Sequence, residues 1–179
     1  MMEDLSLHIL DLAENAAAAG AKRVAIAVNE NERRDVLTIR VTDDGRGMSD
    51  EELRRARDPF FTTKGKKTGL GLALLAQTAG LCGGGVAITT APGAGTRVLA
   101  RFRFHHIDRP PLTKMTETVM MLVFGHPELG LFYSHRRNGR LYRFESRRFI
   151  DRAEASTSPE AIRLVQREIR RGLKRIGAL

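Results

Sequence analysis

The stretch VLTIRVTDDGRGM (residues 36–48) joins a β-rich run to an acidic, glycine-containing turn. Its β-branched residues favour an extended strand, and Asp43 stands where that strand ends, before Gly45 and Gly47. A carboxylate beside two glycines can accept a hydrogen bond from an exocyclic amine while the backbone approaches a flat ring closely. Asp-Gly turns are also common without a ligand, so the stretch gains a functional meaning only together with its neighbours.

The surrounding residues predict alternating helices and strands. A first helix is predicted because Leu5, Ile9 and Leu12 share a helical stripe and Gly20 follows as a stop. The expected order is a helix (4–19), two strands (23–30 and 36–44), a charged helix (49–58), an apolar helix (69–84) and two strands (85–92 and 95–104).

The first helix carries polar residues in an apolar context. Asp11 and Asn15 lie four residues apart and therefore share one face. An Asn carbonyl oxygen is a hard ligand suited to Mg²⁺, which keeps waters and shares phosphate oxygens. A carboxylate one turn away can polarise a water for attack on a γ-phosphate. Glu14 lies about 60° from Asp11 around the helix axis and about 100° from Asn15, so it ranks second as a base.

Two glycine-containing segments follow. KGKKTGLGLALL (64–75) places lysines and glycines before a helix, and N–H groups at a helix N-terminus suit a polyphosphate. It is not a P-loop, because no Gly-Lys-Ser/Thr closes it, and it lacks a GxGxxG fingerprint. Alone it is equally consistent with a flexible loop, and PGAGT (92–96) alone predicts only a hairpin turn.

The order of these motifs resembles the ATP-binding domain shared by DNA gyrase, heat-shock chaperones, histidine kinases and mismatch-repair ATPases (GHKL). Over roughly residues 4–104 it is most similar to the catalytic domain of sensor histidine kinases. The motifs are Asp11…Asn15, Asp43-x-Gly45-x-Gly47, Pro59-Phe60-Phe61-Thr62-Thr63-Lys64, Gly69-x-Gly71 and Gly93-x-Gly95-Thr96. The resemblance implies an α/β two-layer sandwich, with a mixed sheet, helices on one face, and ATP between helices and a lid.

The resemblance also implies roles for individual residues. Asn15 would hold Mg²⁺ and phosphate, Asp43 would read the adenine amino group, and Thr96 would support Asp43 from its strand. Residues 62–68 with Phe60 and Phe61 would form a short lid. The implied nucleotide-binding residues are Asn15, Asp43, Gly45, Gly47, Met48, Phe61, Thr63, Lys64, Gly69, Leu70, Gly71 and Thr96, with Asp11 as the candidate general base.

The sequence departs from the family pattern in three places. Gyrase-type members carry a Glu where this chain has the shorter Asp11, which puts hydrolysis in doubt. Lys67 replaces the third glycine of the usual cluster. The chain begins at the Asn-bearing helix, so we expect no dimerising hairpin with a phosphoacceptor His upstream. None of the five histidines is assigned that role, and His8 is interpreted as a structural residue.

Residues 107–179 differ from the rest in charge. Residues 1–100 hold 13 Lys and Arg against 13 Asp and Glu, whereas residues 101–179 hold 17 against 8, which is the whole net charge of +9. We therefore divide the chain into an ATP-binding domain (1–106) and a basic extension (107–179). The extension predicts a helix (112–124), a hairpin at Asn138-Gly139 and an amphipathic helix (158–176).

The basic surface of the extension has three interpretations. It is a solvated face, a docking surface for an acidic protein, or a site for nucleic acid or an anionic membrane. No RNP-like aromatic pattern or zinc finger supports nucleic acid. The single cysteine, Cys82, is interpreted as a core thiol. The acidic start MMEDLS and the lack of an apolar run of about 18–20 residues predict a cytoplasmic protein.

Three functional hypotheses follow. The first is a Mg-ATP-binding regulatory kinase or nucleotide switch that acts on a separate protein partner. The second is a conformational ATPase with Asp11 as base. The third is a module similar to the anti-sigma-factor kinases, with little catalysis.

Overall fold

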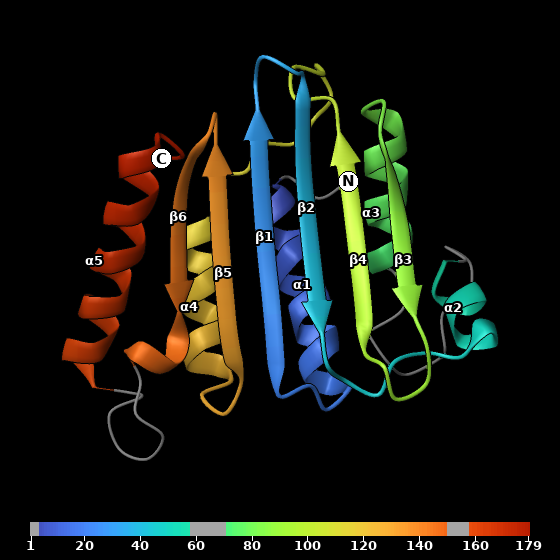
Figure 1. The fold of residues 1–179 in the computed structure, drawn as a ribbon, viewed down its shortest axis with the longest axis horizontal. Helices are drawn as coiled ribbons and strands as arrows, with labels where there is room; N and C mark the ends of the chain where they lie inside the picture. Colours follow the sequence, from blue (N-terminus) through green and yellow to red (C-terminus); the bar gives the residue numbers. More distant parts are fainter. Residues whose placement is uncertain (1–3, 58–70, 150–157) are drawn as a thin grey trace.

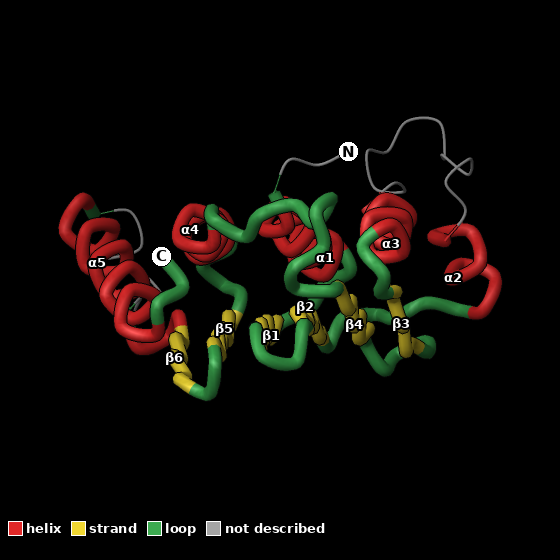
Figure 2. Tube along the Cα trace, turned by 90° about the horizontal axis from the view of Figure 1, so that it is seen from above, coloured by secondary structure: helices red, strands yellow, loops and turns green. Residues whose placement is uncertain are grey.

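The computed structural model describes residues 4–57, 71–149 and 158–179. The chain folds into a six-stranded mixed sheet with helices on one face (Figure 1, Figure 2). The elements are α1 (Leu5–Ala18), β1 (Arg23–Asn31), β2 (Val36–Asp43), α2 (Asp50–Arg57), α3 (Gly71–Leu81), β3 (Gly85–Thr90), β4 (Thr96–Phe102), α4 (Met115–Gly125), β5 (Gly130–Arg137), β6 (Arg140–Glu145), a 3₁₀ turn η1 (Ser146–Arg148) and α5 (Pro159–Ile176). The predicted two-layer α/β architecture is confirmed.

The strands lie in the order β3-β4-β2-β1-β5-β6. Neighbouring strands are antiparallel except β1 and β5, which pair in parallel. The register places Ile26 of β1 opposite Val41 of β2 on one side and opposite Tyr133 of β5 on the other. The basic extension therefore continues the sheet that the first 104 residues begin.

The strands alternate between the two faces of the sheet. Val24, Ile26 and Val28 of β1 are buried toward the helices, as period-2 patterning requires. They belong to one hydrophobic core that also contains Leu12 of α1 and Ile169 of α5. Because a single core spans both segments, the division at residues 106 and 107 stays a prediction about function.

The local signals in the extension are confirmed. Asn138 and Gly139 take positive φ values of 47° and 89°, which a tight hairpin between β5 and β6 requires. The Ser158 hydroxyl accepts a hydrogen bond from the Ala161 N–H, and α5 ends at Gly177 in the left-handed conformation. Cys82 is fully buried, as expected of a core thiol.

Three side chains cap the starts of two helices. Asp4 caps α1 through the Ser6 N–H at 2.8 Å, and it also accepts hydrogen bonds from the backbone and hydroxyl of Thr113. Ser49 and Glu52 form a reciprocal capping box at the start of α2.

In the described part of the chain, no helix is long and apolar enough to cross a bilayer.

The turn between β1 and β2 carries a pH-dependent contact. Asp35 accepts hydrogen bonds from the His105 N–H and from Arg103 Nε, both at 2.8 Å. The backbone bond from His105 and then the Arg103 contact lower the pKa of Asp35 from 3.8 to about 2.

We therefore expect the free energy of unfolding to depend less on pH, below pH 3.8, in Asp35→Asn than in the unaltered protein. A folded-state pKa below the unfolded value contributes stability that is complete above pH 3.8 and is lost as pH falls through about 2. Urea unfolding midpoints of both proteins, measured from about pH 5 to about pH 2, test this. The gap between the two curves should narrow as the pH falls, and a constant gap would contradict the assignment.

Candidate functional site

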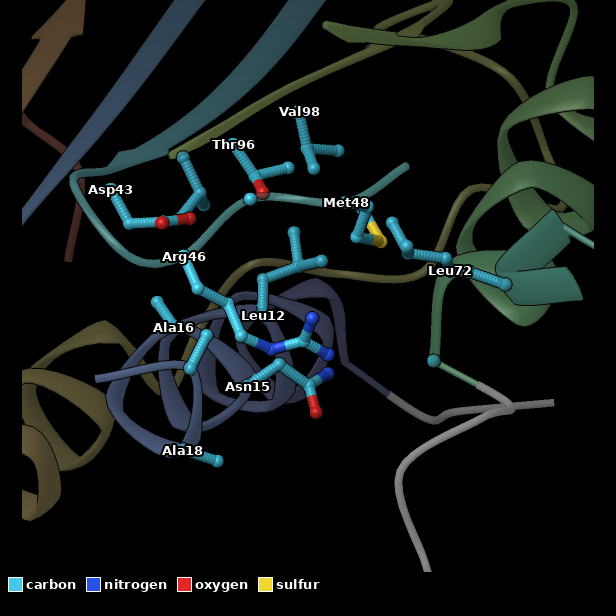
Figure 3. A pocket seen from close by; sticks show the side chains of 15 residues that line it. Leu12, Asn15, Ala16, Ala18, Asp43, Arg46, Met48, Leu72, Thr96 and Val98 are labelled. Atoms are coloured by element: carbon cyan, nitrogen blue, oxygen red, sulfur yellow. The ribbon is translucent and has the colours of Figure 1, made fainter. Parts of the chain in front are cut away.

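A pocket of about 510 Å³ opens between α1, the turn after β2, the start of β4 and the start of α3. Figure 3 shows Asp43, Met48, Thr96 and Val98 on one side of it and Leu12, Asn15 and Ala16 of α1 on the other. Its lining is Leu12, Asn15, Ala16, Ala18, Ala19, Val41, Asp43, Arg46, Gly47, Met48, Ala56, Gly71, Leu72, Thr96 and Val98. The volume is in the range of small-molecule sites, about 300–1,000 Å³.

Asp43 is the carboxylate that lines this pocket. It closes β2, where it pairs with Thr96 of β4, and its Oδ1 accepts the Gly45 N–H at 2.8 Å. Burial raises the pKa of Asp43, and this outweighs the lowering by the Gly45 and Thr96 N–H groups, while Asp44 adds to the rise. The result is a half-buried acceptor that is held in place in the pocket wall, among both polar and apolar lining residues.

The turn after Asp43 is packed between backbone segments. Gly47 has φ +66°, and a Cβ there would lie 1.9 Å from the Ala91 carbonyl oxygen. A Cβ on Gly95 would lie 2.1 Å from the Asp43 carbonyl oxygen. Thr90 Oγ1 ties the two turns together, because it accepts the Met48 N–H and donates to the Gly95 carbonyl, both at 2.9 Å. Close packing against the backbone therefore requires glycine at positions 47 and 95. That the Gly47 backbone approaches a nucleotide base stays a prediction.

The polar pair on α1 is in contact. Asn15 Nδ2 donates to Asp11 Oδ2 at 3.3 Å. This orients the amide so that its carbonyl oxygen is the atom left for another ligand. Asp11 lies behind Asn15 and is not part of the pocket lining. A Cβ on Gly71 would lie 1.5 Å from Asp11 Oδ2, so the start of α3 packs directly on this carboxylate.

Asp11 and Glu14 differ in environment. Burial raises the pKa of Asp11, the Glu14 charge raises it further, and the hydrogen bond from Asn15 opposes them. Glu14 is exposed, and its Oε2 lies 2.9 Å from His126 Nε2. His8 is buried with both ring nitrogens unpartnered among the described residues, and burial lowers its pKa, which favours the neutral ring.

The structure brings six of the sequence-predicted residues to one pocket: Asn15, Asp43, Gly47, Met48, Gly71 and Thr96. Gly45 lies beside it and Asp11 behind it. Phe61, Thr63, Lys64, Gly69 and Leu70 lie outside the described residues.

Sequence reasoning missed several lining residues. Val98 follows Thr96 by two positions, so strand periodicity places both on one face and could have found it. Arg46 stands between Gly45 and Gly47, and Leu72 follows Gly71. No periodic signal separates these two from ordinary surface and core residues.

A protein-family model matches more than half of the chain. The family described as "Histidine kinase-, DNA gyrase B-, and HSP90-like ATPase" matches residues 3–106. This range contains every residue that lines the pocket.

Several curated proteins are similar over part of the chain. The sensor histidine kinase ZraS of Escherichia coli O157:H7 is 35% identical over 93 residues, which are 52% of this chain and 20% of that protein. The nitrogen regulation protein NtrY of Azorhizobium caulinodans is 37% identical over 67 residues, 37% of this chain and 9% of that protein. The chain thus covers a fifth or less of these relatives.

A solved structure that is similar over nearly the whole chain illustrates the fold. The Aquifex aeolicus MutL ATPase domain, solved with ADP, superposes with a TM-score of 0.56 at 16% identity. The superposition covers 92% of this chain and 70% of that one. At this identity, the likeness concerns the fold.

Proposed function

Because the chain belongs to the family of histidine kinase-, DNA gyrase B- and HSP90-like ATPases, we propose that it binds Mg-ATP in the pocket between α1 and the turn after β2. We further propose that it acts as a regulatory kinase or nucleotide switch on a separate protein partner. The similarity to sensor histidine kinases and to a MutL ATPase domain solved with ADP supports the choice of nucleotide.

The observation that carries the proposal is the fixed carboxylate of Asp43. Its hydrogen bond with the Gly45 N–H holds it at the pocket wall, and Thr96 stands opposite it in the β2–β4 ladder. An acceptor-only group in this position selects a ring that presents an amino group, as adenine does. Met48 and Val98 provide apolar surface for the flat ring beside it.

The donor set fits a magnesium ion shared with phosphates. Among the described residues, no group of three His, Cys, Asp or Glu side chains could hold a metal. Asn15 offers one amide oxygen at the pocket, and Mg²⁺ is commonly bound by few protein ligands plus waters and phosphate oxygens. We propose Asn15 as that ligand, and the bound ion would neutralise phosphate charge.

The second candidate function, ATP hydrolysis, rests on Asp11. Burial raises the pKa of this carboxylate, which makes it a stronger base toward a water. Asp11 contacts Asn15, and Asn15 is the proposed ligand of the ion. We propose that Asp11 takes a proton from the water that attacks the γ-phosphorus, while the bond from that phosphorus to the β–γ bridging oxygen breaks and ADP leaves.

The nucleotide proposal is tested by calorimetric titration of the full chain with ATP, ADP and AMP, each with Mg²⁺ and with EDTA. We expect binding of ATP and ADP that weakens when Mg²⁺ is removed. Absence of ATP binding under both conditions would overturn the proposal. A pull-down of cell extract with ATP, ADP and no nucleotide then asks whether a partner is retained in a nucleotide-dependent way.

The hydrolysis proposal gives a separate prediction. We expect Asp11→Asn to lower steady phosphate release at least about tenfold while ATP still binds, because the base is removed and the pocket lining is not. Activity of the unaltered protein should fall as the pH falls through the raised pKa of Asp11. Glu14→Gln is the matched control, because Glu14 contacts His126 instead of Asn15. Equal rates in both variants would exclude Asp11 as the base.

The basic extension is proposed to receive the protein partner. The outer side of α5 exposes Arg163, Arg167, Arg170, Arg171 and Lys174, and none of them forms an ion pair within the described residues. Such a surface favours an acidic partner over a neutral one. Nucleic acid remains the less supported alternative.

A further inference from the structure

The sheet face opposite the helices is free of helices in the described part of the chain (Figure 2). The strand register sorts the residues of this open face into rows that run across the sheet. One row is Leu99, Arg40, Ala27, Ser134 and Arg143. The next row is Arg97, Thr42, Ala25, Phe132 and Glu145.

Small residues lie in the middle of these rows and long residues at their sides. Ala25, Ala27, Thr42 and Ser134 line a groove of about 780 Å³ on this face, together with Arg40, Arg97 and Arg143. We call this groove the sheet trough. Phe132 also lines it and is 39% exposed, so apolar surface is available inside.

The width of the sheet trough suits a helix. Arg40 and Arg143 are separated by three strand spacings, or about 14 Å at roughly 4.8 Å each. An α-helix with its side chains is about 10–12 Å across. The alanines of β1 allow the helix backbone to approach closely, while the arginines can reach its two sides.

The charges on this face are mainly positive. Arg40, Arg97 and Arg143 form no ion pair within the described residues, and the one acidic residue that the strands expose on this face, Glu145, is paired with Arg148 at 2.9 Å. Arg97 and Arg40 are diagonal neighbours on adjacent strands, which is unfavourable for like charges. Glu168 of α5 also contributes to the lining.

We propose that the sheet trough is the docking surface for an amphipathic helix of a partner protein, with its apolar stripe on Ala25, Ala27 and Phe132 and with acidic residues along both edges. Charge complementarity with Arg40 and Arg97 on one edge and Arg143 on the other supports this occupant. Single-stranded nucleic acid needs aromatic platforms for its bases. The floor here is mainly alanine, serine and threonine, so a protein helix fits it better.

This inference adds a second docking surface, separate from the cations of α5, to the proposed function of acting on a protein partner, and it does not depend on nucleotide. The probe is a labelled peptide of about 18 residues, a helix of roughly 27 Å, with an Ala/Leu stripe flanked by glutamates. We expect it to bind the full chain in a fluorescence anisotropy titration. A peptide of the same composition with the stripe scrambled, and one with Lys in place of Glu, should bind at least about tenfold more weakly.

Three variants locate the binding. Arg40→Glu combined with Arg143→Glu should weaken peptide binding about tenfold or more through charge. Ala27→Gln should do the same through shape, without changing the net charge. Arg167→Glu combined with Arg171→Glu reverses two cations of α5 and should leave peptide affinity unchanged. Retained ATP binding in every variant shows that the pocket and the fold are intact.

The opposite results overturn the proposal. Equal binding of the designed and scrambled peptides, or loss of binding only in the α5 variant, would remove the sheet trough as the docking surface. The same holds if a labelled single-stranded oligonucleotide binds more tightly than the peptide and is blocked by Ala27→Gln. A dimer in sedimentation that Ala27→Gln dissociates would assign the trough to a second copy of the chain.

Discussion

ATP affinity should fall about 100-fold in Asp43→Asn, equivalent to roughly 3 kcal/mol. In the native protein, the Gly45 N–H donates to one carboxylate oxygen of Asp43 at 2.8 Å, and the other oxygen is left for the nucleotide. The amide of the variant has only one acceptor oxygen, which the Gly45 N–H would occupy. The new NH₂ group would then face the amino group of adenine, so two donors meet where a donor and an acceptor were paired. Calorimetric titration with Mg-ATP measures the change.

Inosine triphosphate provides the matched test of this argument. Its base carries a carbonyl oxygen where adenine carries the amino group, so the amide of Asp43→Asn should favour it relative to ATP. Asp44→Asn is the control variant, because Asp44 accepts the N–H groups of Lys22 and Arg23 instead. Equal losses for both nucleotides, or an equal effect of Asp44→Asn, would contradict the proposed contact.

The largest expected stability loss comes from Gly172→Ala in α5. A Cβ at this position would lie 2.1 Å from Cε2 of Tyr142, whose ring is fully buried on β6. Neither the helix nor the ring can give way without separating α5 from the sheet. We expect a loss of about 2–3 kcal/mol, in the range measured for overpacked cores. Denaturant unfolding of the full chain measures it.

Gly80→Ala is the matched control for that loss. Gly80 also lies in a helix, α3, but a Cβ there meets nothing within 4 Å. The change should therefore stabilise the protein by up to about 1 kcal/mol through helix propensity. If both variants lost stability equally, the Tyr142 contact would not be the cause.

Most elements could be predicted from local sequence. The first helix was predicted over 4–19 and is found at Leu5–Ala18, and the last was predicted over 158–176 and is found at Pro159–Ile176. These segments carry their own caps, stops and hydrophobic stripes, so the sequence within each of them determines its conformation. The hairpin at Asn138-Gly139 is confirmed for the same reason.

The assembly of the extension could not be predicted in this way. The parallel pairing of β1 with β5 joins residues about a hundred positions apart, for example Ile26 and Tyr133. Alternating burial in each strand is compatible with several partners, and nothing in either stretch specifies the other. The rows of the sheet trough depend on this register, so they could not be predicted from the sequence either.

The candidate site was predicted in outline. Ordered motifs identified six of the residues that line the pocket, from Asn15 to Thr96, because their spacing is characteristic of one family. The contact between Asp11 and Gly71 was not foreseen, since it depends on how α3 packs on α1. The roles of these residues toward ATP stay predictions.

The parallel neighbour of β1 also has a consequence for solubility. A chain cut after residue 106 would lose β5 and β6, and the N–H and C=O groups along Val24, Ile26 and Val28 would lack partners on that side. An exposed, apolar edge strand pairs readily with other chains. By covering this edge, the extension protects the first half of the chain from self-association, so the two halves should be produced together.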